Sequence, residues 1–397
     1  MSRLWDKGAA LDAAVLAFTA GEDHALDDRL VAYDVRASIA HARTLEAGGF
    51  LSASDADAIE SALREIGAEH SGGHWKVTLA EEDGQTALEA RLTARLPEAG
   101  ARIHLGRSRN DQVLAALRLY LKDAVAVLAS GVSTAVEALS DLAVAQGRVA
   151  LPGYTHMQQA MPSSVDLWAR GYAAELEDDR LGLLGCLRRI DRNPLGSAAG
   201  YGTPGLTLDR DLSARLLGFA AVHDPVTAVQ LSRGKAEASL LFEVTLLLSD
   251  IGRLASDLLL FYTQEFSFVA LPDEFTTGSS IMPQKRNPDV FELIRGRTAV
   301  AQACLDEVLG IVAKLPGGYQ RDLQLIKVPL FRGIDLASQI LAILPSALAG
   351  VRFRPERIRL DPAIHAAEEA NRLSVAEGIP FREAYRRVGA RLKPGPV

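Results

Sequence analysis

A long proline-free run, from Asp111 to about Gln146, places the strongest constraint on how this chain can fold. Its apolar side chains recur at steps of three and four, which predicts one continuous amphipathic helix. At a rise of about 1.5 Å per residue, that helix would be roughly 50 Å long. The stripe consists of Leu114, Leu117, Leu121, Val125, Leu128, Val132, Val136 and Leu139. A stripe of this length can be buried only against other long helices, so the sequence indicates a helical bundle.

Two further runs alternate steps of four and three strictly, which is the heptad seam of helices packed nearly parallel. They are Leu240, Val244, Leu247, Ile251, Leu254, Leu258 and Phe261, and then Ile294, Thr298, Ala301, Leu305, Val308, Val312 and Leu315. A fourth helix is expected from about Ser164 to Ile190 on a looser stripe. The apolar content of these helices exceeds what one isolated hairpin can bury. We therefore expect a central bundle that other subunits complete.

The regions on either side of this bundle differ from it. In the first hundred residues, shorter helices are expected to break at Gly48-Gly49, at Gly72-Gly73 and at Pro97. From about Arg352 the chain is first rich in proline and then predicts a small helical hairpin around residues 378–380. There is little strand signal. The prediction is a mainly α protein of three domains: an N-terminal helical domain (1–106), a central domain of long helices (107–350) and a small C-terminal helical domain (351–397).

Composition limits the classes of function. The chain has 397 residues, is 48% hydrophobic and carries a net charge of -7, which argues against a nucleic-acid-binding surface. The first residues lack the apolar segment of an export signal, and no uninterrupted apolar run reaches about 18 residues. We therefore expect a soluble, cytoplasmic protein. Cys186 and Cys304 fall in helical patterns and are interpreted as buried, reduced thiols.

Polar stretches that could carry chemistry stand at the ends of the helices. The first, Gly106-Arg107-Ser108-Arg109-Asn110-Asp111, directly precedes the longest helix. Free N–H groups at a helix N-terminus beside two arginines favour an anion site. The alternative is a capped helix with solvated arginines. A second stretch surrounds His156, between Pro152 and Gln159, where a loop histidine is either a general acid or base or simply exposed.

A third stretch, residues 278–289 (GSSIMPQKRNPD), interrupts two long helices with glycine, serine, proline and basic residues. Ser279 or Ser280 becomes a nucleophile or proton carrier only if another group activates it. Lys285 and Arg286 supply positive charge for an anionic substrate. Glu292, in the first turns of the next helix, is placed where it could orient a histidine. The alternative is a solvent-exposed connection between helices.

A fourth stretch, Gly317 to Gln324 with Lys327, ends the third long helix and offers donors for a carboxylate or an amino acid. Two weaker candidates are set aside. The glycine-rich residues 196–202 do not follow a strand, so they make a poor dinucleotide loop. His70 and His74 flank Ser-Gly-Gly, which interrupts a helix, and no third metal ligand is evident, so a plain linker is favoured there.

Together these stretches resemble a known superfamily. GSSIMPQKRNPD resembles the signature of the fumarate-releasing lyases, which include class II fumarase and aspartase. GRSRNDQ (106–112), GYTHMQ (153–158) and YQRDLQ with Lys327 resemble the argininosuccinate lyases within it. The resemblance implies a three-domain α-helical fold in which long helices from four subunits form the core of a homotetramer. It also implies that three chains build each active site, and that the reaction needs neither cofactor nor metal.

The reaction implied by the resemblance is reversible elimination of fumarate from argininosuccinate to give L-arginine. Removing the proton beside a carboxylate creates extra negative charge, which fixed cations and donors must stabilise. The resemblance assigns Ser279 to proton transfer at carbon, Lys285 with Asn287 to carboxylate stabilisation, and His156, oriented by Glu292, to the other proton. Whether His156 or Ser279 is the base stays open. Substrate contacts are assigned to Ser108, Arg109, Asn110, Thr155, Asn287, Tyr319, Arg321, Gln324 and Lys327.

The sequence departs from the family pattern in its first domain. Where the family carries Glu-Asp-x-His, this chain has Glu82-Asp83-Gly84-Gln85, and glutamine cannot change its charge near neutral pH. The stretch around Asp23 also lacks an expected serine, and the C-terminal domain is shorter than usual. Because of Gln85, one alternative function is that of a related lyase, which releases fumarate from another N-substituted aspartate. A non-catalytic, crystallin-like structural homologue is the other alternative.

Overall fold

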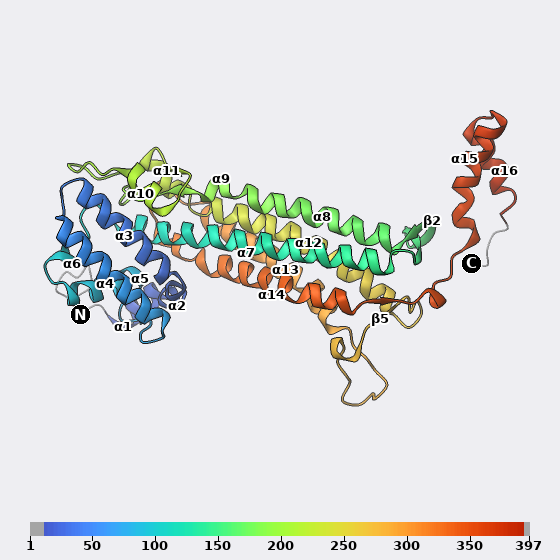
Figure 1. Cartoon of the computed structure of the whole chain (residues 1–397), viewed down its shortest axis with the longest axis horizontal. Coiled ribbons are helices and arrows are strands. Elements are labelled where there is room, and N and C mark those ends of the chain that lie inside the picture. Colours follow the sequence, from blue (N-terminus) through green and yellow to red (C-terminus); the bar gives the residue numbers. More distant parts are fainter. Residues whose placement is uncertain (1–11, 393–397) are drawn as a thin grey trace. The chain divides into compact units, whose positions relative to one another are not determined.

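The structure, a computed structural model, describes residues 12–392 and is mainly helical (Figure 1). The α-helices are α1 Ala13–Ala20, α2 Asp23–Asp27, α3 Val31–Ala47, α4 Ala53–Ser71, α5 Gly84–Arg95, α6 Ala99–Arg102, α7 Arg109–Gln146, α8 Val165–Gly185, α9 Leu187–Ile190, α10 Arg210–Leu217, α11 Val226–Leu231, α12 Lys235–Tyr262, α13 Asp289–Val312, α14 Lys327–Gly350, α15 Ala366–Glu377 and α16 Phe381–Gly389. The strands are β1 Ala150–Thr155, β2 Gln158–Ser164, β3 Arg192–Asn193, β4 Ala221–Val222, β5 Val269–Ala270 and β6 Arg352–Phe353. The mainly α fold predicted from the sequence is confirmed.

The chain forms two compact units, each made of three segments. Unit 1 comprises Met1–Ala129, Leu181–Thr245 and Val300–Leu336, and unit 2 comprises Ser130–Arg180, Leu246–Ala299 and Ala337–Val397. The boundaries fall inside α7, α8, α12, α13 and α14, so each unit contains part of every long helix. The division into three domains at residues 106 and 350 stays a prediction.

The four expected long helices are present. The longest is α7, with 38 residues, and it begins two residues before the predicted start. The helix expected from Ser164 to Ile190 is α8 followed by the single turn of α9, with Cys186 between them. α12 and α13 contain the two heptad runs, and the residues of those runs that face inward, such as Leu247 and Val308, are fully buried. Periodicity therefore located the bundle correctly.

A fifth long helix, α14, was not among those expected, and it holds Pro345 in its interior. Its N-terminal turns are fixed within unit 1 by Arg29, whose guanidinium donates to both carboxylate oxygens of Asp335 at 2.9 and 2.8 Å. The segment Arg321–Gly350 is long and apolar enough, by composition, to cross a membrane. However, 56% of its most apolar window is buried within the chain, which is the pattern of a core helix.

The N-terminal helices form a second core within unit 1. α3, α4 and α5 lie side by side (Figure 1) and bury a shared apolar cluster that includes Leu45, Ile59, Leu63 and Leu88. As expected, α3 ends before Gly48, α4 ends before Gly72 and α5 ends shortly before Pro97. In unit 2, α15 and α16 form the predicted C-terminal hairpin around a small cluster of Ala370, Ala384 and Val388.

The expectation of little strand structure missed one β-hairpin. β1 and β2 pair antiparallel from Ala150 opposite Ser164 to Thr155 opposite Gln158. Two prolines, a glycine and a register irregularity at Gly153/Tyr154 hide the alternation that normally indicates strands. The other two sheets are two-residue pairs, β3 with β4 and β5 with β6.

Candidate active site

The first candidate region lies at the start of α7 in unit 1. The Ser108 N–H donates to Asp111 Oδ1 at 2.9 Å, and Ser108 Oγ accepts the Asn110 N–H at 3.3 Å. These two bonds cap the start of α7: Ser108 Oγ satisfies the N–H of the second helical residue, and the carboxylate of the third helical residue accepts the Ser108 N–H. They fix the orientation of Ser108, Arg109 and Asn110, the three predicted substrate contacts in this stretch.

Asp111 also holds a second loop against this helix start. Its Oδ2 accepts the N–H groups of Gly196, at 3.1 Å, and Ala198, at 2.8 Å, and the side chain is fully buried. Burial raises the pKa of Asp111 to about 6, although the N–H donors and the nearby Arg107 favour the carboxylate. The glycine-rich stretch that makes a poor dinucleotide loop is therefore held against the start of α7.

Glu82 connects two of the predicted motifs. Arg109 donates to Asp83 Oδ2 at 2.6 Å and lies 3.7 Å from Glu82 Oε1. Arg321, which is far away in sequence, donates to the same Glu82 oxygen at 2.9 Å. Glu82 is 4% exposed and has a φ of +72°, a region that costs a non-glycine residue about 1–3 kcal/mol. The structure thus brings Arg109 and Arg321 together around one buried carboxylate.

Lys327 lies in the same unit, at the start of α14, and is completely buried. Its ammonium donates to Asp27 at 2.5 Å and pairs with Asp23 at 2.9 Å. Burial opposes a charged lysine, but the two carboxylates outweigh burial and raise the pKa of Lys327. Burial likewise raises the pKa of Asp23, against the effect of Lys327. Direct contact between Lys327 and a substrate stays a prediction, because both pairings of its ammonium are with protein carboxylates.

The remaining predicted residues of this region surround the same cluster. Tyr319 stacks against the guanidinium of Arg233, whose carbon lies 5.5 Å from the ring centroid. Gln324 has a buried side-chain oxygen with no hydrogen-bond partner in the described part of the chain. Gln85, in the first turn of α5, is 2% exposed, and its side-chain nitrogen also has no partner among residues 12–392. Unpartnered buried amides of this kind are available to a ligand.

The second candidate region belongs to unit 2 and begins at the tip of the β1–β2 hairpin. His156 and Met157 are the two turn residues, with φ values of +51° and +62°. Positive φ at both positions is typical of the tight turn that matches strand twist. Thr155 and His156 are exposed, so the turn presents them to the surroundings of unit 2.

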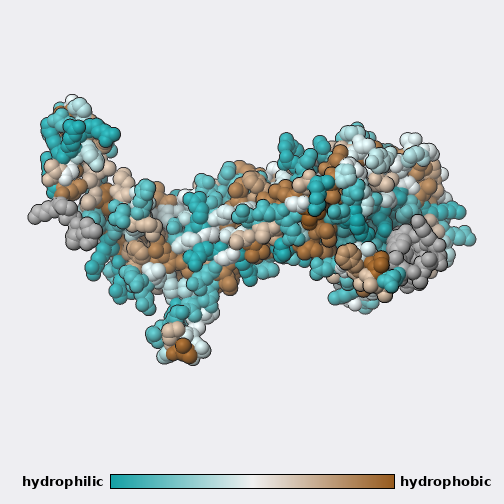
Figure 2. All heavy atoms as spheres, turned by 180° about the vertical axis from the view of Figure 1, so that it is seen from behind, coloured by the Kyte–Doolittle hydropathy of each residue, from teal (hydrophilic) through white to brown (hydrophobic). Residues whose placement is uncertain are grey.

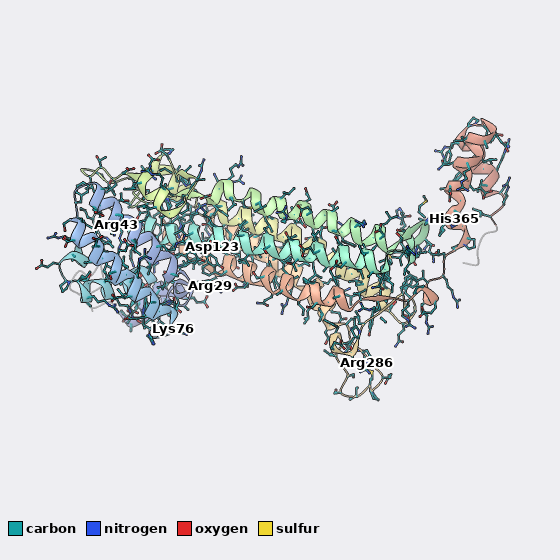
Figure 3. The ribbon with its side chains drawn as sticks, viewed as in Figure 1. Arg29, Arg43, Lys76, Asp123, Arg286 and His365 are labelled. Atoms are coloured by element: carbon teal, nitrogen blue, oxygen red, sulfur yellow. The ribbon has the colours of Figure 1, made fainter. Side chains whose placement is uncertain are left out.

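Ser279, Lys285 and Asn287 lie in a loop that is closed at its base. Thr277 and Asn287 exchange backbone hydrogen bonds of 3.0 and 2.8 Å, and the Asn287 side chain donates to Gly278 O at 3.2 Å. The loop between them projects from the helices of unit 2, as the label of Arg286 in Figure 3 shows. Figure 2 shows apolar atoms at its end, in agreement with the 83% exposure of Ile281.

Within this loop, Ser279 Oγ accepts the N–H groups of Met282 at 3.2 Å and Ile281 at 3.4 Å. Lys285 is exposed, and Glu292 is exposed in the first turn of α13. Among the described residues, no hydrogen bond or ion pair joins any two of His156, Ser279, Lys285 and Glu292. Orientation of His156 by Glu292 therefore stays a prediction.

Sequence reasoning missed Asp23, Asp27, Glu82, Asp111 and Arg233 as parts of the site. The available signal was the i,i+4 spacing of Asp23 and Asp27, which places both acids on one face of a helical turn. Within residues 12–392, no three His, Cys, Asp or Glu side chains are grouped so that they could hold a metal ion.

Comparison with known proteins identifies the family. A family model described as "Lyase" matches residues 9–302. The argininosuccinate lyase of Sorangium cellulosum is 48% identical over 397 residues, which cover 100% of this chain and 92% of that protein. The argininosuccinate lyase of Xylella fastidiosa (strain Temecula1) is 42% identical over 386 residues, covering 96% and 86%.

The fold agrees with these matches. The crystal structure of class II fumarase from Schistosoma mansoni superposes with a TM-score of 0.78 at 18% identity, covering 94% of this chain and 91% of that one. The chain therefore belongs to the lyase family and, within it, to the argininosuccinate lyases.

Proposed function

We propose that this chain catalyses the reversible elimination of fumarate from argininosuccinate to give L-arginine, in the cytoplasm, as a step of arginine biosynthesis. The observation that carries the proposal is the cluster around Glu82, which joins the GRSRND and YQRDLQ stretches through Arg109 and Arg321. Full-length identity of up to 48% to argininosuccinate lyases supports the same substrate.

The charges of this cluster suit a substrate with both signs of charge. The start of α7, with free N–H groups and Arg109, favours a carboxylate. The acidic side chains Asp83 and Glu82 beside it favour the cationic arginine portion. Because these groups are fixed before the reaction, they need no reorganisation when negative charge develops on the substrate.

The two N–H groups on Ser279 Oγ favour Ser279 as the base at carbon. A serine hydroxyl is a weak base because its alkoxide is unstable in water. N–H donors from Ile281 and Met282 stabilise negative charge on that oxygen, and Lys285, a cation of the same loop, would add to the effect. His156 would then give a proton to the departing guanidinium nitrogen.

A homotetramer with active sites shared by three chains would bring the two regions together. Two features support this arrangement. Among residues 12–392, no hydrogen bond or ion pair joins His156, Ser279, Lys285 and Glu292 to one another, although the proposed chemistry needs them close together. In addition, α12 and α13 leave large apolar side chains exposed outside their heptad runs: Phe242, Leu246, Leu293, Val300 and Leu309. Apolar surface of this kind is characteristic of helices that pack against other subunits.

The test is fumarate release from argininosuccinate by the purified protein, followed by ultraviolet absorbance. Ser279→Ala should lower kcat about 10²–10⁴-fold, the usual contribution of a positioned acid or base. Ser280→Ala is the matched control, since it removes a neighbouring hydroxyl from the same loop and should retain activity. Both variants should elute at the oligomer size of the unmodified protein. No fumarate at high enzyme concentration would reject the proposed activity, and full turnover by Ser279→Ala would remove Ser279 from the mechanism.

A second candidate is a lyase of the same type acting on another N-substituted aspartate, and the buried, unpartnered amide of Gln85 favours it. A panel of adenylosuccinate, aspartate and guanidino analogues separates the two candidates. A higher kcat/KM on any of these than on argininosuccinate would select the second candidate.

A further inference from the structure

A cationic cavity of about 500 Å³ lies in unit 1, between α9, α11 and the start of α12. None of its lining residues is acidic. Its polar lining consists of Arg188, Arg189, Arg192, His223, Ser232 and Lys235. None of these six residues was assigned a role in the proposed reaction.

The positive charge of this cavity is not neutralised by the protein. Among the described residues, neither Arg188, Arg192 nor Lys235 forms an ion pair or a side-chain hydrogen bond. Arg189 donates only to a hydroxyl, Ser239 Oγ, at 3.1 Å. Four cations around a concave surface, without carboxylates, create a local positive potential that attracts anions even though the whole chain is acidic.

His223 adds a buried polar group to the cavity wall. Its backbone is fixed on both sides: its N–H donates to Asn193 O at 3.0 Å, and its carbonyl accepts from Arg210 at 2.8 Å. The side chain is 5% exposed, and Nδ1 has no hydrogen-bond partner in the described part of the chain. An unpartnered buried group of this kind destabilises the fold, and a bound ligand that supplies the missing hydrogen bond removes that destabilisation.

The surroundings of His223 favour its uncharged form. Burial, reinforced by Arg118, Arg192 and Arg210, lowers the pKa of His223 to about 4, and only Asp224 acts in the opposite direction. An anion in the cavity would offset these positive charges. Anion binding and proton uptake by His223 should therefore strengthen each other.

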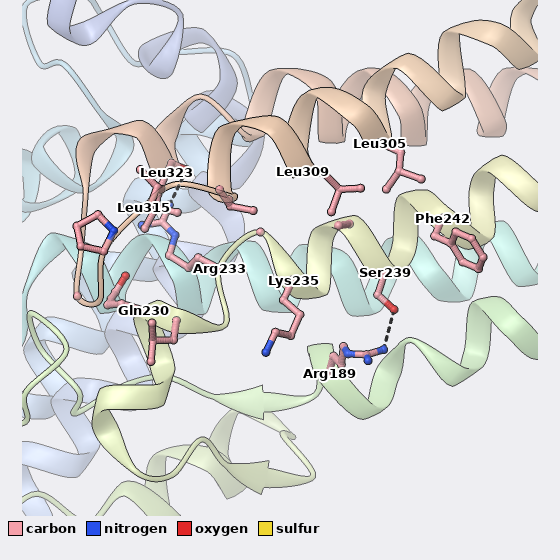
Figure 4. Close-up of a pocket in the computed structure, with 16 residues that line it drawn as sticks. Arg189, Gln230, Arg233, Lys235, Ser239, Phe242, Leu305, Leu309, Leu315 and Leu323 are labelled. Carbon is pink, nitrogen blue, oxygen red and sulfur yellow. Dashed lines mark hydrogen bonds between the residues drawn. The ribbon is translucent and has the colours of Figure 1, made fainter.

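We propose that this cavity binds the phosphate group of a small phosphorylated molecule. Guanidinium groups match phosphate oxygens with paired N–H donors, and three arginines line this cavity. An apolar groove adjoins it and shares Arg189, Leu231 and Lys235 with it. Figure 4 shows Arg189 and Lys235 on one side of α12 and Leu305 and Leu309 of α13 on the other. A ring or apolar portion attached to the phosphate would contact Leu231, the apolar side chain that lines both hollows.

Calorimetric titration of the full-length oligomer with inorganic phosphate, pyrophosphate, ATP and citrate tests the proposal. Pyrophosphate and ATP should bind, and both Arg188→Gln and Lys235→Gln should weaken that binding about tenfold or more, as expected for loss of a charged donor. Arg64→Gln is the matched control, because it removes an equally positive, exposed side chain that is paired with Glu60 outside the cavity. If ATP binds more tightly than pyrophosphate, the ligand of this cavity is a nucleotide. If the two bind equally, the ligand is a free phosphate.

Sulfate, whose charge is constant over the range, tests the role of His223. Its affinity should rise from pH 7.5 to pH 5, and His223→Gln should remove most of that rise while retaining binding at pH 7.5. Unchanged binding in both cationic variants, or citrate binding as tightly as pyrophosphate, would overturn the phosphate assignment. Fumarate release is measured separately, so a chain inactive on argininosuccinate that still binds pyrophosphate leaves this site standing.

Discussion

Replacing Lys327 by methionine should destabilise the protein because it removes the cation from between two buried carboxylates. Lys327 is fully buried and pairs with Asp27 at 2.5 Å and Asp23 at 2.9 Å, and these acids are only 1% and 7% exposed. Breaking a buried pair by removing one partner costs about 3–5 kcal/mol. An unfolding entropy near 2.1 cal/mol/K per residue gives about 0.8 kcal/mol/K for this chain, so Tm should fall by about 4–6 °C.

The loss should depend on pH in a defined direction. The pKa of Asp23 is already raised by burial, and losing Lys327 raises it further. In the unfolded chain both acids ionise near their ordinary pKa. The loss of folding free energy in Lys327→Met is therefore complete only at a pH above the raised pKa of the folded state. It disappears at a pH below the ordinary pKa of the unfolded state. Lys327→Met should therefore lose more stability at pH 7.5 than at pH 5.

Differential scanning calorimetry at fixed protein concentration measures this effect. The triple variant Lys327→Met/Asp23→Asn/Asp27→Asn keeps the shape of the cluster without its charges, so it should recover most of the lost Tm at pH 7.5. An equal loss at both pH values, or a triple variant no more stable than Lys327→Met, would refute the electrostatic explanation.

Three further variants test other parts of the structure. Gln85→His should raise kcat/KM on argininosuccinate about tenfold if a titratable group is needed there, whereas an unchanged value would make Gln85 a neutral replacement. Burial, with Arg107, lowers the pKa of His41 to about 3. The stability that neutral His41 provides is therefore complete above pH 6.5 and is lost as the pH falls toward 3. Acid titration of His41→Gln should show a shallower loss over that range, and an identical acid profile would exclude His41. Gly234 has a φ of +80°, and an added Cβ would overlap Val312, so Gly234→Ala should cost about 2–4 kcal/mol in thermal unfolding. Gly310→Ala is the control, because nothing lies near its added Cβ; an equal effect of both changes would contradict the steric reason.

The sequence predicted the long helices because their stripes are regular and uninterrupted. α14 escaped prediction for a physical reason. Its second half has an exposed face made mainly of small residues, Ala342, Ser346 and Ala349, and it contains Pro345. Small exposed residues contrast little with the buried face, and an internal proline argues against a helix.

The residues of the site were predictable one motif at a time, but their partners were not. Lys327 stood out beside a recognisable stretch, yet its partner Asp27 lies 300 residues away in sequence. Glu82 lies in the stretch where the family carries Glu-Asp-x-His, and only the replacement of that histidine by Gln85 drew attention to the stretch. Nothing local indicates that its carboxylate connects Arg109 with Arg321. Pairings of this kind depend on the fold, and hydrophobic periodicity does not encode them.

Asp111 accepts hydrogen bonds both from its own turn and from a later segment of the chain, and this affects the order in which the site forms during synthesis. Its contact with Ser108 is local, so the start of α7 can be capped as soon as this segment leaves the ribosome. Its contacts with Gly196 and Ala198 require chain that is made 85 and 87 residues later. A nascent chain released before Ala198 would therefore carry a formed helix start whose buried carboxylate lacks two of its three backbone donors. Ribosome-bound chains ending on either side of residue 198, with the length needed to clear the exit tunnel added, should differ in protease resistance around Arg109.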